Sequence, residues 1–266
     1  MTPPFRFAAN LGFLWRDRPL AERIERAGAA GFDAVELHDE AQRAPLEEVR
    51  AALREARLPL LGLNARMGET MGRAALPGEE AAAREEIDEA VEVARALGAG
   101  AVHVLGGRTA PTPEAMGAYR AGLAHACARA APHGLAILIE PICEAAAPGY
   151  VLSRMGQAAE VVAAVGAPNL RVLFDVYHVA QAGDPLVETF AAHAGRIGHV
   201  QLADPEARAE PRLDGPPERA APALLSAFAG AGYRGAIGCE YRPAGTVEEG
   251  IGWLAGLRGR LGEPRG

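Results

Sequence analysis

Four oxygen-donor side chains stand at the ends of four successive apolar stretches in the second half of the chain. These final residues are Glu140 of stretch 135–140, Asp175 of 170–175, Gln201 of 196–201 and Glu240 of 235–240. A lone buried carboxylate is costly unless it is paired, hydrogen-bonded or bound to a metal. Two glutamates, an aspartate and a glutamine form an all-oxygen ligand set, which suits hard divalent cations. We therefore expect these four residues to hold Mg²⁺ or Mn²⁺.

Alternating patterns along the chain indicate the elements that must position these residues. The eight strand-like stretches are 5–10, 33–38, 59–64, 100–105, 135–140, 170–175, 196–201 and 235–240. Helical patterns occupy 19–30, 45–57, 79–97, 113–132, 154–165, 184–194, 218–230 and 247–258. Glycine follows most of these helical stretches, as is typical of helix ends.

Eight strand–helix units in this length predict a single-domain (β/α)₈ TIM barrel over residues 1–266. An open doubly wound sheet is the alternative, but it would usually carry a glycine-rich phosphate loop after its first strand. Residues 10–13, Asn-Leu-Gly-Phe, are no such loop.

The barrel fold predicts where the chemistry lies, because its active sites are built at the carboxyl ends of the strands. Besides the four ligand candidates, the polar residues at these ends are Asn10, Glu36, His38, Asn64 and His103. We assign Asn64 and His103 to substrate binding, although a packing role for His103 stays open, and for His38 we favour the core over a place in the site. Since side chains alternate along a strand, Cys239 should point outward into the helix layer.

Composition excludes several classes of protein. The net charge is −7 and no basic block occurs, so nucleic acid is not an expected partner. No stretch approaches 18 uninterrupted apolar residues, and the first residues lack the pattern of a signal peptide. The cysteines Cys127, Cys143 and Cys239 lie far apart and form no zinc-like pair. We expect a reduced, cytoplasmic protein with no membrane partner.

The chain resembles hydroxypyruvate isomerases and 2-oxo-tetronate isomerases, which belong to the xylose isomerase-like TIM barrels. The resemblance is carried by IEP at 139–141, PGY at 148–150, VGAPNLRVLFDVYHV at 165–179, GHVQ at 198–201 and GCEYRPAG at 238–245. It implies that Glu140, Asp175, Gln201 and Glu240 are metal ligands, and that Glu140 and Glu240 also form the catalytic acid/base pair. It further implies substrate contacts for His178 and Arg208, and Arg66 resembles an arginine found in some members.

One loop departs from the family pattern. Many members carry a polar loop of the type Asn-Thr-Arg-Asp after IEPI, whereas residues 143–147 read Cys-Glu-Ala-Ala-Ala here. The usual histidine after Arg208 is Ala209. The ligand set is therefore expected to follow the family, while the walls of the substrate site are expected to differ.

The resemblance implies a metal-dependent isomerase of the aldose–ketose type. Its substrate would be a small hydroxy-keto acid, such as hydroxypyruvate, which is converted to its aldehyde form through an enediolate. A sugar epimerase or a dehydratase on the same barrel is one alternative. A non-catalytic barrel that binds sugar acids is another, and a homo-oligomer is possible in each case.

Overall fold

The structure is a computed structural model that describes residues 5–262, and the eight terminal residues 1–4 and 263–266 lie outside the described part. Eight parallel strands close into a barrel in which each strand pairs with the next along the chain and β8 pairs with β1. The strands are β1 Phe7–Asn10, β2 Ala34–Leu37, β3 Leu60–Asn64, β4 Ala101–His103, β5 Ala136–Ile139, β6 Leu170–Asp175, β7 Ile197–Leu202 and β8 Ile237–Cys239. The single-domain TIM barrel expected from the sequence is confirmed.

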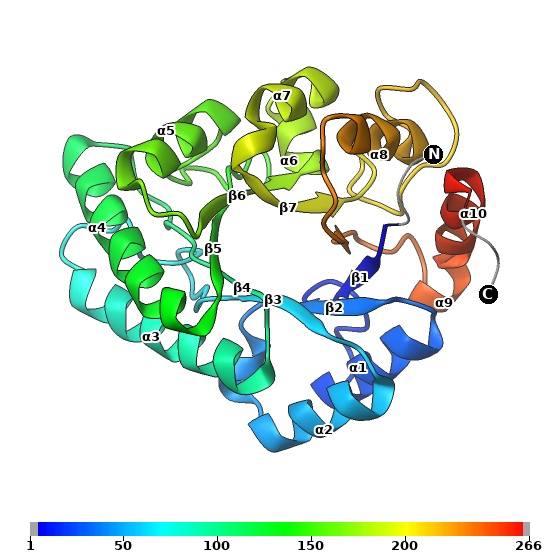
Figure 1. The fold of residues 1–266 in the computed structure, drawn as a ribbon, viewed down its shortest axis with the longest axis horizontal. Coiled ribbons are helices and arrows are strands. Elements are labelled where there is room, and N and C mark those ends of the chain that lie inside the picture. The colour runs from blue at the N-terminus through cyan, green and yellow to red at the C-terminus, as the bar shows by residue number, and fades with distance from the viewer. Residues whose placement is uncertain (1–4, 263–266) are drawn as a thin grey trace.

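Helices surround the barrel as an outer ring (Figure 1). The α-helices are α1 Leu20–Ala29, α2 Leu46–Ala56, α3 Glu80–Leu97, α4 Pro113–Ala130, α5 Met155–Val165, α6 Val176–Gln181, α7 Leu186–His193, α8 Ala221–Gly230, α9 Val247–Gly250 and α10 Gly252–Leu261. Short 3₁₀ helices η1 Glu40–Arg43, η2 Ala131–His133 and η3 Ala194–Arg196 join them. None of the helices in residues 5–262 is both long and apolar enough to cross a membrane.

Two helical features differ from the sequence-based expectation. The short helix α6 follows β6 directly, because the Asp175 carboxylate accepts hydrogen bonds from the first backbone N–H groups of the helix. The stretch predicted as one helix over 247–258 is two helices, α9 and α10, with Ile251 between them. Glycines at the ends of α3 and α5 do adopt the left-handed conformation, with φ of 69° at Gly98 and 68° at Gly166.

Glycines, alanines, leucines and polar residues line the barrel interior, and large apolar residues fill the layer between strands and helices. The interior contact cluster is formed by Ala101, Leu138 and Leu173. Cys239 points instead into the outer layer, where it is fully buried in the main hydrophobic core, as strand alternation predicts. A cavity of about 210 Å³ remains inside the barrel below the strand ends. The barrel thus has room at its centre for polar side chains.

Candidate metal and active site

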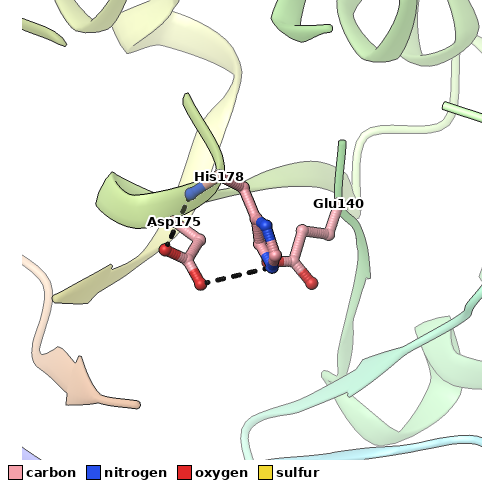
Figure 2. Close-up of side chains that lie close together, drawn as sticks. All are labelled: Glu140, Asp175 and His178. Carbon is pink, nitrogen blue, oxygen red and sulfur yellow. Dashed lines mark hydrogen bonds and ion pairs between the residues drawn. The ribbon is translucent and has the colours of Figure 1, made fainter. Parts of the chain in front are cut away.

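Three buried side chains meet at the carboxyl ends of β5 and β6. Glu140, Asp175 and His178 each offer a ligand atom, and these atoms lie within 4.8 Å of one another. The His178 Nε2 atom is 3.8 Å from Glu140 Oε1 and 3.7 Å from Asp175 Oδ2. Figure 2 shows the imidazole beside both carboxylates. This group could hold a metal ion.

The local sequence explains how His178 reaches this position. Asp175 is the last residue of β6 and the N-cap of α6, and its Oδ1 accepts hydrogen bonds from Tyr177 N at 2.7 Å and His178 N at 3.4 Å. One carboxylate therefore ends the strand, starts the helix and places His178 in the first helical turn. On the other side of the ring, His178 Nδ1 lies 3.2 Å from the Sγ of buried Cys143.

Glu240 enters the site from the end of β8 with partners of its own. Its Oε2 accepts a hydrogen bond from Asn10 Nδ2 at 2.7 Å and lies 3.5 Å from His38 Nε2. Its Oε1 accepts from Arg208, whose same nitrogen is 3.4 Å from Asp175 Oδ2. Arg208 thus bridges two of the predicted ligands.

The backbone and two aromatic rings hold Arg208 in place. Arg208 adopts a left-handed conformation with φ of 54°, which is uncommon for a residue other than glycine and is often found at functional sites. Its guanidinium carbon lies 4.6 Å from the centre of the Phe13 ring and 5.1 Å from that of Tyr177. These cation–π contacts aim the buried charge at the carboxylates.

Negative charge exceeds positive charge in this buried cluster. When Glu140, Asp175 and Glu240 are all ionised, Arg208 compensates only one of the three carboxylates. Burial and the nearby Asp175 and Glu240 carboxylates raise the pKa of Glu140 well above its usual range. Burial also raises the pKa of Asp175 to about 7, although Arg208 opposes it.

The pKa of Glu240 is shifted in the other direction, below its usual value. Burial acts to raise its pKa, but the His38 hydrogen bond and the charge of Arg208 outweigh this effect and lower it to about 2. The protein's own cations therefore stabilise one ionised glutamate, whereas for Glu140 the charge of Arg208 is outweighed by burial and the neighbouring carboxylates. A divalent cation would supply the missing compensation.

Unpartnered buried atoms give a second indication that the donor set fits a metal. Glu140 Oε1 and Gln201 Oε1 are both buried and have no hydrogen-bond partner among the described residues. The amide orientation of Gln201 is fixed, because its Nε2 donates to Glu36 at 3.0 Å, so the oxygen is free to face another group. A buried acceptor without a partner costs free energy, which a bound cation would remove.

His103 and Asn64 act as a pair in the site wall. Asn64 Oδ1 lies 3.2 Å from His103 Nδ1, and since a carbonyl oxygen only accepts, the Nε2 of a neutral His103 is left as an acceptor. Burial lowers the pKa of His103 to about 4, so the ring is neutral near pH 7. Its Nε2 is buried without a hydrogen-bond partner among residues 5–262, which suits a substrate hydroxyl.

A cavity of about 170 Å³ opens onto these groups. Drug-sized ligands occupy pockets of about 300–1,000 Å³, so this cavity suits a smaller molecule. Glu140, Glu240, His103, His178 and Arg208 line it on the polar side. Apolar wall residues are Phe13, Met67, Met71, Leu105, Ile142 and Ala146. Ala146 lies in the loop whose sequence departs from the family pattern.

The structure places three histidine and arginine residues differently from expectation. Arg66 does not line this cavity, because its guanidinium forms a two-pronged ion pair with Glu89, at 2.6 and 2.7 Å. His38 lines the cavity beside Glu240, so it takes the place in the site that was the less favoured of its two expected positions. Arg242 was missed. It follows Tyr241 of the CEY motif, is exposed at the cavity, and its side chain pairs with no described residue.

Comparison with known proteins shows which proteins the chain is similar to over nearly its full length. The chain is 36% identical to the putative hydroxypyruvate isomerase of Homo sapiens over 98% of both chains. It is 37% identical to the 2-oxo-tetronate isomerase of Cupriavidus necator, covering 96% of this chain and 99% of the relative.

A solved structure has the same fold over nearly the full length of the chain. The crystal structure titled AP endonuclease, family 2, from Brucella melitensis superimposes with a TM-score of 0.89 at 31% identity, over 95% of this chain and 98% of that one. The family described as xylose isomerase-like TIM barrel matches residues 24–257. The chain therefore belongs to the xylose isomerase-like TIM-barrel family and is similar over nearly its full length to hydroxypyruvate and 2-oxo-tetronate isomerases.

Proposed function

We propose that the protein is a metal-dependent isomerase that interconverts a small hydroxy-keto acid and its aldehyde form, such as hydroxypyruvate and tartronate semialdehyde. The observation that carries the proposal is the buried cluster of Glu140, Asp175 and His178 beside a small cavity that Glu140 and His178 line, with a Glu140 oxygen that has no hydrogen-bond partner among residues 5–262. The relatives named hydroxypyruvate isomerase and 2-oxo-tetronate isomerase support the substrate class.

The residues present fit a hard divalent cation, Mg²⁺ or Mn²⁺. We propose Glu140, Asp175, Gln201 and Glu240 as its ligands, since all four offer oxygen atoms and all four are buried. The cation would act as a Lewis acid that stabilises negative charge developing on the substrate oxygens. His178, with a pKa lowered to about 3 by burial and by the charge of Arg208, is a neutral imidazole next to the two carboxylates and is proposed to contact substrate.

The protein's own groups then move the proton. In hydroxypyruvate, a proton leaves the hydroxymethyl carbon and a proton is returned to the neighbouring carbonyl carbon, while the hydroxyl proton is lost from the first oxygen and the former carbonyl oxygen gains one, which gives the aldehyde. Glu140 and Glu240 are the proposed acid/base residues, because both carboxylates line the cavity. His103 Nε2 is free to accept from a substrate hydroxyl, and the buried, unpartnered Nε of Arg208 is free to donate to a substrate oxygen.

Arg242 is the proposed partner of the substrate carboxylate. It lines the cavity and has a guanidinium without a partner among residues 5–262, whereas the Arg66 guanidinium is occupied by Glu89. A hydrogen bond to a charged group is worth about 1.5–3 kcal/mol. We therefore expect Arg242→Met to raise the KM for the acid about 10- to 100-fold with a smaller effect on kcat.

Steady-state kinetics on Arg242→Met and on Arg66→Met separate the two arginines. Arg66→Met should leave KM near the wild-type value. A rise in KM for Arg66→Met alone would reverse the assignment.

A substrate panel followed by NMR tests the proposed reaction. Hydroxypyruvate, longer 2-oxo acids and neutral ketoses would each be supplied with Mg²⁺ or Mn²⁺. Conversion of a hydroxy-keto acid to its aldehyde isomer supports the proposal. Conversion of neutral sugars alone would favour an epimerase, loss of water would indicate a dehydratase, and binding without turnover would indicate a non-catalytic barrel.

A further inference from the structure

A further buried carboxylate, Glu36 on β2, lies below the proposed ligands and has no role in the proposed chemistry. It is 5% exposed and accepts three hydrogen bonds inside the barrel. Its Oε1 accepts from His199 Nε2 at 2.5 Å, and its Oε2 accepts from Gln201 Nε2 at 3.0 Å and from Asn10 Nδ2 at 3.3 Å. Glu36 therefore links two strands, β2 and β7, that are not neighbours in the barrel.

These contacts determine which way two amide groups face. Asn10 Oδ1 accepts from the backbone N–H of Gly12 at 3.0 Å, so its Nδ2 is turned to Glu36 and Glu240. Gln201 Nε2 is held by Glu36, so the Gln201 oxygen faces away from Glu36, and it is this atom that is buried without a partner. Without Glu36, the Gln201 amide could rotate by half a turn, and its N–H donors would then lie where its oxygen now lies.

A glycine makes room for this arrangement. Gly238 of β8 pairs with Gln201 of β7 and with Ala8 of β1. A Cβ atom at Gly238 would collide with Glu36 Oε1, so the carboxylate would have to move from its present place. The Glu36 carboxylate thus occupies the space that a side chain at position 238 would fill.

We propose that Glu36 is a positioning residue that fixes the Gln201 amide with its oxygen toward the divalent cation, and that Gly238 is required to admit it. The proposal rests on the proposed function, because it assumes that a cation binds at Glu140, Asp175, Gln201 and Glu240. Groups that orient metal ligands typically contribute about 10- to 100-fold to metal affinity.

Mn²⁺ affinity, measured from the electron paramagnetic resonance signal of free Mn²⁺ without substrate, tests this role. Glu36→Met removes both acceptors at similar length and should weaken Mn²⁺ binding about 10- to 100-fold. Glu36→Gln keeps one acceptor for the Gln201 amide and should bind Mn²⁺ nearly as the wild type does. In a Gln201→Ala background, Glu36→Met should cause little further loss, since the Gln201 amide is absent and the Asn10 amide is still oriented by the backbone N–H of Gly12.

Three results would overturn the proposal. They are wild-type affinity in Glu36→Met, an undiminished effect of Glu36→Met in the Gln201→Ala background, and equal losses in Glu36→Gln and Glu36→Met. If Glu36→Met does not fold, Gly238→Ala takes its place, because the added methyl group would displace the Glu36 carboxylate. Gly238→Ala should also weaken Mn²⁺ binding. Wild-type Mn²⁺ affinity in Gly238→Ala would contradict the positioning role of Glu36. A wild-type protein that binds no Mn²⁺ would instead refute the proposed metal site itself, and the positioning role with it.

Discussion

Replacing Glu240 by glutamine is expected to lower kcat about 10²- to 10⁴-fold, the usual contribution of a positioned acid/base group. The change keeps the size of the side chain and one oxygen for the metal but removes its ability to carry the proton, so the variant is assayed at saturating metal. Substrate affinity should change much less, because Arg242 and His103 remain in the cavity wall. Steady-state kinetics with a direct measurement of substrate binding would separate the two effects.

Glu248→Gln provides the matched control for this variant. Glu248 lies on the same segment after β8 but is exposed, where it pairs with Trp15 and Arg26. Its kcat should stay near the wild-type value. If Glu240→Gln kept wild-type turnover while Glu248→Gln lost it, the acid/base assignment would be wrong.

Replacing Glu140 by glutamine is expected to affect stability in opposite ways with and without metal. Burial and neighbouring carboxylates raise the pKa of Glu140 in the folded state. The free energy of unfolding therefore falls as the pH rises above the ordinary pKa of a glutamate. Near pH 7, the metal-free glutamine variant should therefore be at least as stable as the metal-free wild type. Mn²⁺ at 100 times its Kd should stabilise the wild type by about 2.7 kcal/mol, and the variant should lose most of this gain.

Chemical denaturation of both proteins, with EDTA or with Mn²⁺, measures these four free energies of unfolding. Equal stabilisation of both proteins by Mn²⁺ would show that Glu140 is not a ligand. A large loss of stability in the metal-free variant would show that the ionised carboxylate is compensated by the protein itself, contrary to the charge excess described above.

Much of the fold and of the site could be predicted from the chain because both follow from simple periodicity. Eight alternating units predict a barrel, and a barrel brings the ends of its strands together. Glu140, Asp175, Gln201 and Glu240 end their apolar stretches, and strand alternation explains why Cys239, beside Glu240, faces the helices. These features require no knowledge of side-chain conformations.

Side-chain partners between distant segments could not be predicted in this way. Arg66 is paired with Glu89, 23 residues later, and this pairing depends on how α3 packs beside the loop after β3. The role of Arg208 depends on a left-handed backbone conformation and on two aromatic rings, Phe13 from the loop after β1 and Tyr177 from α6. Glu36 reaches His199 across the barrel only because Gly238 carries no side chain. Each case requires three-dimensional packing that sequence spacing does not contain.

One measurement tests the central claim, metal-dependent isomerisation in this cavity, most directly. The protein would be stripped with EDTA, reloaded with Mg²⁺ or Mn²⁺, and followed by NMR in D₂O with hydroxypyruvate as substrate. We predict no turnover without metal, formation of tartronate semialdehyde after reloading, and deuterium in the product to the extent that the moved proton exchanges with water. Turnover that is indifferent to EDTA, or a protein that binds neither cation and converts no hydroxy-keto acid, would contradict the account.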